Sequence, residues 1–405
     1  MPTPSDSFTV REATSADHEG VIALCGEVFS AHEGAAVRHL LAGEGYGPGR
    51  WTVAVDGEGV VVSCCTLLPP RLRYGIVEVP AAQIEFVATK ASARKHGLVR
   101  AQFDLHHQWA AEAGALLLII TGIPYLYRRL GYGYAIEFSP QYRVLDVPTP
   151  PEGWSIETAT EADRDALTEL ERAAKARQDL TLEWPDGGWE WVLAGASDWD
   201  EEILVARRDG EVDGFAYIQR RLEEDHVEVG GTAMTEGAAQ ALVATAVARA
   251  GELKVFLIAR DGDPWATVVQ RAGVRDPAWF NAVYARVPDP AAFLDHVKDE
   301  LSRRLAGTAF AHHSGELVLS FYEDGAVVAV EDGVVTSARR DPDPAQDPMD
   351  DDKAGIAPDA LPALLLGRFS AEELELRYDD VGYVADRGLV GALFPKRSFD
   401  IWAPI

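Results

Sequence analysis

A turn rich in basic residues precedes a long helical segment in the first third of the chain. Arg94, Lys95 and Arg100 flank Gly97, and the helix that follows extends to Glu112. The first N–H groups of a helix carry partial positive charge and receive phosphate oxygens, and a glycine lets the backbone approach them closely. The turn therefore suits a pyrophosphate. The other interpretation is a basic helix start that faces solvent.

The elements around this turn are predicted to form an α/β unit. Residues 82–88 have the pattern of a strand, and a second buried strand, residues 115–121, follows the helix. The chain then passes through a short helix that ends at Gly131 and returns as a strand. The turn thus joins the end of one strand to the start of the helix.

The same order of elements returns in the second third of the chain. Residues 10–17 (VREATSAD) match residues 156–163 (IETATEAD) position for position, and both carry a helix-start signature. A hairpin with an Asp-Gly turn follows in each case. We therefore predict two copies of one α/β unit, at about residues 8–145 and 154–287.

The last third has a different pattern, with a helix at residues 291–305 and alternating strands at residues 316–322 and 326–331. At 405 residues the chain is too long for one ordinary core. We expect an α/β protein (α+β mixed sheets) of three domains. Their predicted bounds are residues 1–150, 151–290 and 291–405.

The composition narrows the class of protein. Hydrophobic residues make up 47% and charged residues 25%, as in soluble globular proteins. No apolar run approaches the ~20 residues that span a bilayer, and the N-terminus lacks the pattern of a signal peptide. The three cysteines form neither a disulfide framework nor a metal-ligand spacing. We expect a cytoplasmic protein with no membrane partner and no metal.

The net charge of −28 bears on the partners. Binding of nucleic acid requires clustered basic residues, so we expect no nucleic acid partner. An acidic surface attracts cationic small molecules such as polyamines and aminosugars. The alternative is that the acidity only keeps the protein soluble. The sequence leaves the oligomeric state open, and a homo-oligomer is compatible with it.

Two segments resemble known acetyltransferases. The basic turn is similar to the acetyl-CoA loop of the GNAT superfamily, in which Gln or Arg, two residues, Gly, one residue and Gly or Ala follow one another. Val99 departs from the last position, as in the enhanced-intracellular-survival (Eis) branch of aminoglycoside acetyltransferases. Residues 125–133 (YLYRRLGYG) resemble the Eis-type segment Tyr-x-Arg-Phe-Gly-Tyr-Gly.

The resemblance implies two tandem GNAT folds followed by a sterol-carrier-like α+β domain. The first GNAT domain would be catalytic and would bind acetyl-CoA as a co-substrate, whereas the second would be degenerate. The residues implied in cofactor binding are Val87, Thr89, Arg94, Lys95, His96, Gly97, Leu98, Val99 and Arg100.

The resemblance also implies catalytic roles. Tyr127 would protonate the departing CoA thiolate, which a phenol with a pKa near ~10 can do; the alternative is a packing aromatic. The backbone N–H groups of Val87 and Thr89 would bind the pantetheine arm and polarise the thioester carbonyl.

Two groups compete for the role of general base. In the Eis branch the terminal carboxylate, here that of Ile405, can take the proton of the amine. Many other GNAT enzymes keep a base on the strand before the loop, which here is Glu85. Glu85 is separated from Val87 and Thr89 by even steps, so we expect all three on one side of the strand. A bound water that relays the proton is a third option.

The second copy lacks these features. Its equivalent turn, residues 232–240, has no basic residue and carries Glu236, which would repel phosphate. When Gly273 is aligned with Gly131, Val269 stands in the place of Tyr127. We expect this copy to complete the core and to wall the acceptor pocket.

We therefore predict an acetyl-CoA-dependent N-acetyltransferase that acts by direct transfer on an amine, and we expect that amine to belong to an aminoglycoside- or polyamine-like cation. Two alternatives stay open. One is a protein or peptide amine as acceptor, and the other is a non-catalytic protein that binds acyl-CoA or a lipid.

Overall fold

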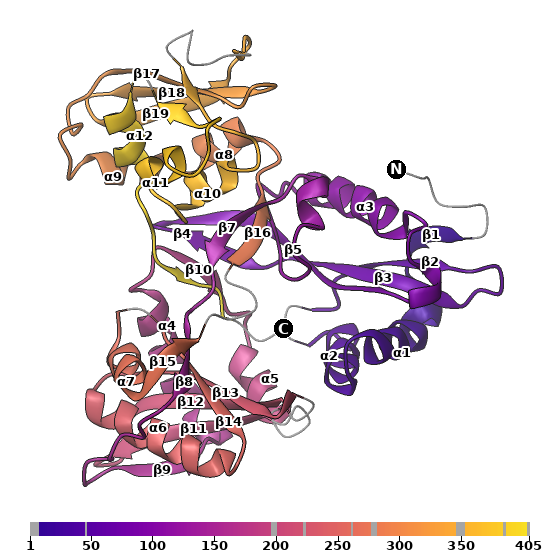
Figure 1. Cartoon of the computed structure of the whole chain (residues 1–405), viewed down its shortest axis with the longest axis vertical. Helices are drawn as coiled ribbons and strands as arrows, with labels where there is room; N and C mark the ends of the chain where they lie inside the picture. Colours follow the sequence, from indigo (N-terminus) through magenta and orange to yellow (C-terminus); the bar gives the residue numbers. More distant parts are fainter. Residues whose placement is uncertain are drawn as a thin grey trace. The chain divides into compact units, whose positions relative to one another are not determined.

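The computed structural model describes residues 8–44, 47–195, 201–221, 224–260, 262–276, 282–345, 353–383 and 386–402. The chain forms two compact units (Figure 1). The first unit contains residues 1–137 and 282–398, and the second contains residues 138–281 and 399–405. The division into three consecutive domains stays a prediction.

A mixed sheet organises the N-terminal part of the first unit. Its strands are β1 (Thr9–Glu12), β2 (Arg50–Val55), β3 (Val61–Leu68), β4 (Arg71–Tyr74), β5 (Val77–Thr89), β6 (Leu117–Ile120), β7 (Gly133–Glu137) and β16 (Ala282–Arg286). The order is β1-β2-β3-β5-β6-β16-β7, and β4 pairs with the first part of β5. Only β5 and β6 are parallel among these pairs.

Helices cover both faces of this sheet. They are α1 (His18–Val28), α2 (Ala31–Leu41) and α3 (Leu98–Glu112), with short 3-10 helices η1 (Ser15–Asp17), η2 (Ala91–Ala93) and η3 (Tyr127–Leu130). Figure 1 shows α3 on one face and α1 and α2 on the other. Cys64 packs in the core under α1 and Cys65 in the core under α3, because successive strand residues point to opposite faces.

The rest of the first unit is a second sheet with its own helices. The strands are β17 (Gly315–Ser320), β18 (Gly325–Glu331), β19 (Val334–Arg340), β20 (Ala354–Gly355) and β21 (Gly382–Tyr383), in the order β19-β18-β17-β20-β21. The helices are α8 (Pro290–His296), α9 (Lys298–Leu305), α10 (Leu361–Leu366), α11 (Ala371–Glu375) and α12 (Arg387–Leu393). The helix expected at residues 291–305 is thus two helices that meet at Val297. The buried α10 packs against β7.

The second unit repeats the order of the first. Its strands are β8 (Gln141–Val144), β9 (Ser155–Thr158), β10 (Leu180–Glu183), β11 (Glu201–Arg208), β12 (Glu211–Arg221), β13 (His226–Ala233), β14 (Lys254–Ile258), β15 (Gly273–Asp276) and β22 (Phe399–Asp400). The main sheet has the order β15-β8-β14-β13-β12-β11-β9. The helices are η4 (Glu161–Asp163), α4 (Arg164–Lys175), α5 (Gly188–Gly195), α6 (Glu236–Ala250) and α7 (Pro264–Ala272).

Each main sheet contains a strand that the repeat assigns to the other copy. The strand β8, at the end of the first repeat, pairs with β14 and β15 in the second unit. The strand β16, at the end of the second repeat, pairs with β6 and β7 in the first unit. The two copies expected at residues 8–145 and 154–287 therefore exchange their last strands.

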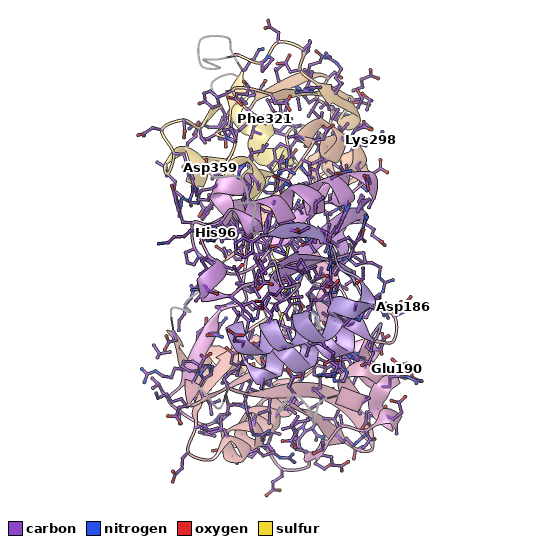
Figure 2. The ribbon with its side chains drawn as sticks, turned by 90° about the vertical axis from the view of Figure 1, so that its right-hand side faces the viewer. His96, Asp186, Glu190, Lys298, Phe321 and Asp359 are labelled. Atoms are coloured by element: carbon purple, nitrogen blue, oxygen red, sulfur yellow. The ribbon has the colours of Figure 1, made fainter. Side chains whose placement is uncertain are left out.

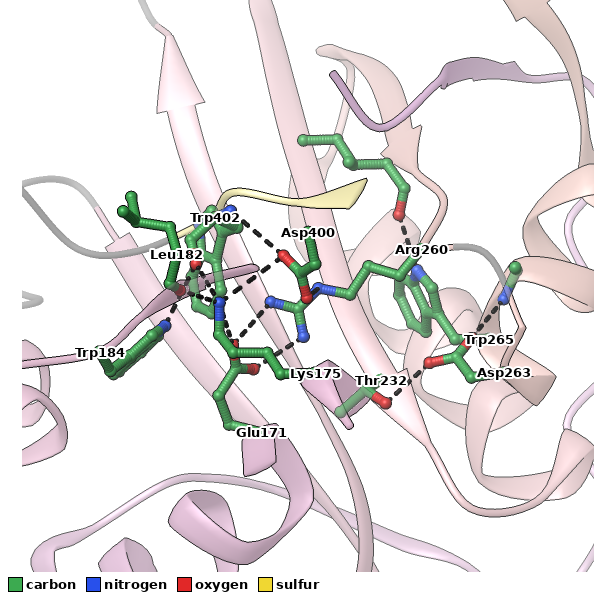
Figure 3. A network of polar contacts seen from close by, with 12 residues as sticks. Glu171, Lys175, Leu182, Trp184, Thr232, Arg260, Asp263, Trp265, Asp400 and Trp402 are labelled. Atoms are coloured by element: carbon green, nitrogen blue, oxygen red, sulfur yellow. Dashed lines mark hydrogen bonds and ion pairs between the residues drawn. The ribbon is translucent and has the colours of Figure 1, made fainter. Parts of the chain in front are cut away.

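The C-terminal segment, from residue 399, packs within the second unit through strand pairing and ion pairs. Strand β22 pairs in parallel with β10, and Asp400 lies within ion-pair distance of Arg260 and Lys175. Both cations also contact Glu171, and all four side chains are almost fully buried (Figure 3). Trp402 stacks on Tyr217 with ring centroids 4.5 Å apart.

Within the described ranges, no helix combines the length and the apolar character that a membrane crossing requires.

Candidate active site

The basic turn has the backbone geometry of an anion site. Lys95 and Gly97 adopt left-handed conformations, with φ of 71° and 76°, before α3 begins at Leu98. The first N–H of the helix to bond back is that of Ala101, to the oxygen of Gly97 at 3.1 Å. Among the described residues, the preceding N–H groups of the helix have no hydrogen-bond partner, as expected for the first turn of a helix, so they can receive a ligand.

The side chains of this turn add positive charge and cover. Arg94, Lys95 and Arg100 are exposed. The ring of His96, which is labelled in Figure 2, packs on Phe8 with centroids 5.1 Å apart. Leu98 is buried under the helix, and Val99 is half-buried. Among the predicted residues of this turn, the cations and the backbone are therefore the groups that can contact a ligand. Free amides and exposed cations are the groups that a pyrophosphate requires.

The strand before the turn separates from its parallel neighbour. Strands β5 and β6 pair from Ala81 to Ile84, and the pairing ends there. The N–H of Lys90 bonds to Val62 of β3. Because successive N–H groups of a strand point in opposite directions, those of Val87 and Thr89 point away from β3, toward the opened side. The predicted pantetheine amides are therefore directed into the opening between β5 and β6.

Glu85 lies on the other face of the sheet from the one that even spacing predicts. The register of β3 and β5 shifts between Cys64 and Thr66, and Phe86 has a φ of 52°. This bulge takes up one extra residue and reverses the alternation. Gln83 and Glu85 alternate with Ile84, which packs under α3, so their side chains point to the face of α1 and α2. The expectation that Glu85, Val87 and Thr89 share one side of the strand is wrong for this reason.

The carboxyl group of Glu85 belongs to a half-buried side chain and is hydrogen-bonded. Gln83 Nε2 donates to Glu85 Oε1 at 2.8 Å, and Thr121 Oγ1 donates to the same oxygen at 3.3 Å. Burial raises the pKa of Glu85 to about 7, although both hydrogen bonds oppose the shift. A carboxyl group with a pKa near neutrality exchanges protons readily at physiological pH, which a general base must do.

Tyr127 lies on the α3 face of the same opening. Its ring is 2% exposed and stacks on Phe103, with centroids 5.8 Å apart. Burial, and then the charge of Glu85, raise the pKa of Tyr127, so the phenol stays protonated at neutral pH. Its hydroxyl makes no hydrogen bond within the described part of the chain, and a Cβ on Gly122 would lie 3.6 Å from it. The phenol is therefore protonated, and its proton is not engaged with another described residue.

Three site residues escaped the sequence prediction, namely Gln83, Thr121 and Thr66. Gln83 and Thr66 are buried, and Thr66 pairs with Glu85 in the register. Their only sequence signal is a polar side chain inside an otherwise apolar strand. Ile405 lies outside the described residues.

The second copy closes its equivalent sites with its own side chains. At the N-terminus of α6, Thr235 Oγ1 accepts a hydrogen bond from Ala238 N, and Glu236 pairs with Arg271. Strands β13 and β14 pair as far as Gly230 and Ile258, which correspond to Ile84 and Ile120. Gly231 thus stands in the place of Glu85. This helix start has a side-chain cap and an acidic residue where the start of α3 has exposed cations.

Residues 9–135 match the family model of the acetyltransferase (GNAT) domain. No curated protein gives a significant match to the sequence. The fold and the family model together identify residues 9–135 as an acetyltransferase domain of the GNAT class.

Solved structures extend the likeness of fold to nearly the whole chain. A probable N-acyltransferase from Enterococcus faecalis has a TM-score of 0.73 at 15% identity, over 97% of this chain and 98% of that one. A GCN5-related N-acetyltransferase from Anabaena variabilis has a TM-score of 0.70 at 13% identity, over 97% and 99%. Eis1 from Mycobacterium abscessus has a TM-score of 0.63 at 17% identity, over 98% and 99%. The chain thus has tandem GNAT folds, as the internal repeat predicts. That residues 291–405 are sterol-carrier-like stays a prediction.

Proposed function

We propose that the first domain transfers the acetyl group of acetyl-CoA directly to the amine of a cationic small molecule, of aminoglycoside or polyamine type. The observation that carries the proposal is the opening between β5 and β6. It has the free amides of Val87 and Thr89 on its edge, Tyr127 on one face and Glu85 on the other. A thioester held in this opening meets a proton donor and a proton acceptor on opposite sides.

In this proposal, each face of the sheet receives one of the two substrates. The basic turn lies at the start of α3, so the phosphates of acetyl-CoA would bind on the α3 face, with the pantetheine arm along Val87 and Thr89. The amine would approach from the face of α1 and α2, where Glu85 lies. The net charge of −28 favours a cationic acceptor.

The proposed reaction needs no covalent enzyme intermediate. Glu85 takes a proton from the ammonium group, and the freed lone pair forms the C–N bond at the thioester carbonyl. The amides of Val87 and Thr89 stabilise the oxyanion. The C–S bond then breaks, and Tyr127 gives its proton to the sulfur. The nitrogen loses its second proton to Tyr127, directly or through water, so the sum is an N-acetylamine, CoA and one released proton.

Substitution of the phenol tests this function. Tyr127→Phe is expected to lower kcat about 100-fold or more, because a positioned general acid contributes about 10²–10⁴, while the Kd for CoA stays unchanged. The matched control is Tyr132→Phe, which removes another buried phenol, one that is hydrogen-bonded to His107 at 2.9 Å, and should keep wild-type turnover. Thiol release is followed with polyamines, aminoglycosides and short peptides as acceptors.

Each outcome of this panel has a distinct meaning. Turnover that is unaffected by Tyr127→Phe would remove the phenol as the acid. A preference for peptides over polyamines and aminoglycosides would replace the small cation by a protein amine. CoA binding by the wild type without turnover of any amine would favour a non-catalytic binder.

A further inference from the structure

Two buried oxygens beside Glu85 have no hydrogen-bond partner among the described residues. They are Gln83 Oε1 and Thr66 Oγ1, and their side chains are 4% and 0% exposed. Leaving a buried polar group unpaired costs about 1–3 kcal/mol, so such groups in proteins generally serve a ligand or an ordered water. Thr66 lies on β3 and Gln83 on β5, next to Glu85.

The two oxygens lie on the same face as Glu85. Thr66 is the register partner of Glu85 on β3, and residues directly opposite each other share a face. Gln83 precedes Glu85 by two strand positions and is hydrogen-bonded to it through Nε2, so its Oε1 remains as an acceptor. Three acceptor groups, one of them a carboxyl, thus gather on the face of α1 and α2.

The surroundings of this cluster favour a small cationic group. At Gly49, which has a φ of +63°, a Cβ would lie 2.5 Å from Thr66 Oγ1, so the glycine backbone packs closely beside that hydroxyl and only a small group fits next to it. Trp51, the next register neighbour of Thr66, stacks on Phe86 at 5.9 Å. Aromatic faces attract ammonium groups, and the cluster contains no cation.

We propose that Thr66, Gln83 and Glu85 form the subsite for the reacting nitrogen of the acceptor, and that this nitrogen is a primary ammonium group. An alkylammonium group has three N–H donors, which matches the three acceptors. The three acceptors hold the ammonium form. Once Glu85 has taken one proton, the amine turns its freed lone pair to the thioester carbonyl, and the oxygen of Gln83 or Thr66 keeps one of the two remaining N–H groups. This inference rests on the proposed acetyl transfer and adds the residues that select a primary amine.

The test uses the full-length enzyme with its best acceptor from the panel above. Thr66→Val and Gln83→Met are expected to raise the KM for the amine about tenfold or more, the effect of losing a hydrogen bond to a charged group, with the Kd for CoA unchanged. The control is Thr52→Val on the neighbouring strand. Thr52 is equally buried, but its hydroxyl is paired with His106 at 2.9 Å.

The melting temperature separates binding from folding. Thr66→Val removes an unpaired hydroxyl and should keep or raise Tm, whereas Thr52→Val breaks a hydrogen bond and should lower Tm while the KM for the amine stays unchanged. An unchanged KM in both Thr66→Val and Gln83→Met, with an active wild type, would overturn the subsite and leave the transfer function intact. A wild type that turns over no amine would overturn the transfer function and the subsite with it.

Discussion

Glu85 and Tyr127 lie on opposite faces of one sheet, yet the charge of Glu85 affects the protonation of Tyr127. The charge of Glu85 contributes to the raised pKa of Tyr127. When Glu85 accepts a proton from the amine, that contribution disappears and the phenol becomes a stronger acid. In the proposed reaction, the proton donor is therefore strengthened at the moment when the thiolate leaves.

The pH profile should reveal Glu85. A base must be unprotonated, so we expect kcat/KM to rise with pH through about 7, the pKa to which burial raises Glu85. Gln83→Met removes a hydrogen bond that lowers this pKa, so it should move the rise to higher pH. Initial rates between about pH 5.5 and 9 measure the profile. An unchanged profile in Glu85→Gln would contradict the assignment.

Truncation separates the two candidate bases. If Glu85 is the base, deletion of Ile405 should leave turnover nearly unchanged, whereas Glu85→Gln should lower kcat about 100-fold or more. Adding residues after Ile405, which moves the carboxylate without removing Ile405, is the second arm. Loss of turnover in both terminal variants, with an active Glu85→Gln enzyme, would assign the role to the terminal carboxylate.

The sequence could predict the turn and Tyr127 because their residue types and spacing are local. It could not place Glu85. A phenylalanine with a left-handed backbone conformation is rare, and the residues around Phe86 do not predict it. One bulged residue was enough to move the carboxyl group to the opposite face of the sheet.

At the scale of elements, α3 and α6 occupy the same place in the repeat, but their N-termini differ in charge and in capping. The start of α3 has free amides and exposed cations, whereas that of α6 is capped by Thr235 and carries Glu236. The contrast between a basic and an acidic turn is readable in the sequence. The cap itself is visible only in the structure.

CoA titration tests this contrast. We expect one CoA per chain, and the double variant Arg94→Gln with Lys95→Gln should weaken binding about tenfold with a smaller dependence on salt, because two charge-assisted contacts are lost. Glu236→Gln, at the equivalent turn, should leave the affinity unchanged. Calorimetry gives both the stoichiometry and the Kd, and two sites per chain would contradict the prediction.

The C-terminal segment depends on buried charge. Asp400→Asn leaves Arg260 and Lys175 short of one anion, and breaking a buried pair typically costs about 3–5 kcal/mol. We expect a clearly lower Tm and a smaller free energy of unfolding in urea. The control is Glu169→Gln, whose partner Arg172 is exposed, and which should change stability by less than about 1 kcal/mol. Equal effects of the two variants would show that the buried network contributes little.

At the scale of the whole molecule, the repeat predicts two similar folds but not the exchange of their last strands. Sequence similarity between copies reports which elements exist, whereas pairing partners are set by edges that lie far apart in the chain. Strands β8 and β16 have ordinary strand patterns, and these patterns do not predict which sheet each strand joins.

A chain that ends at residue 137 should therefore not fold by itself. It lacks β16, which pairs with both β6 and β7, so two strand edges would be left open. We expect aggregation of this fragment and soluble expression of the full chain. Hydrogen exchange and size-exclusion chromatography check the state of the fragment, and a monomeric, protected fragment would contradict the prediction.

The exchange of strands also delays the pairing of β6 while the chain is synthesised on the ribosome. Strand β6 ends at Ile120 and its partner β16 begins at Ala282, so about 160 more residues must be made before the pair can form. At about 5–20 residues per second this takes about 8 to 30 s. During that interval the nascent chain exposes the unpaired edge of β6. We expect chaperones to bind this edge before the main sheet of the first unit is complete.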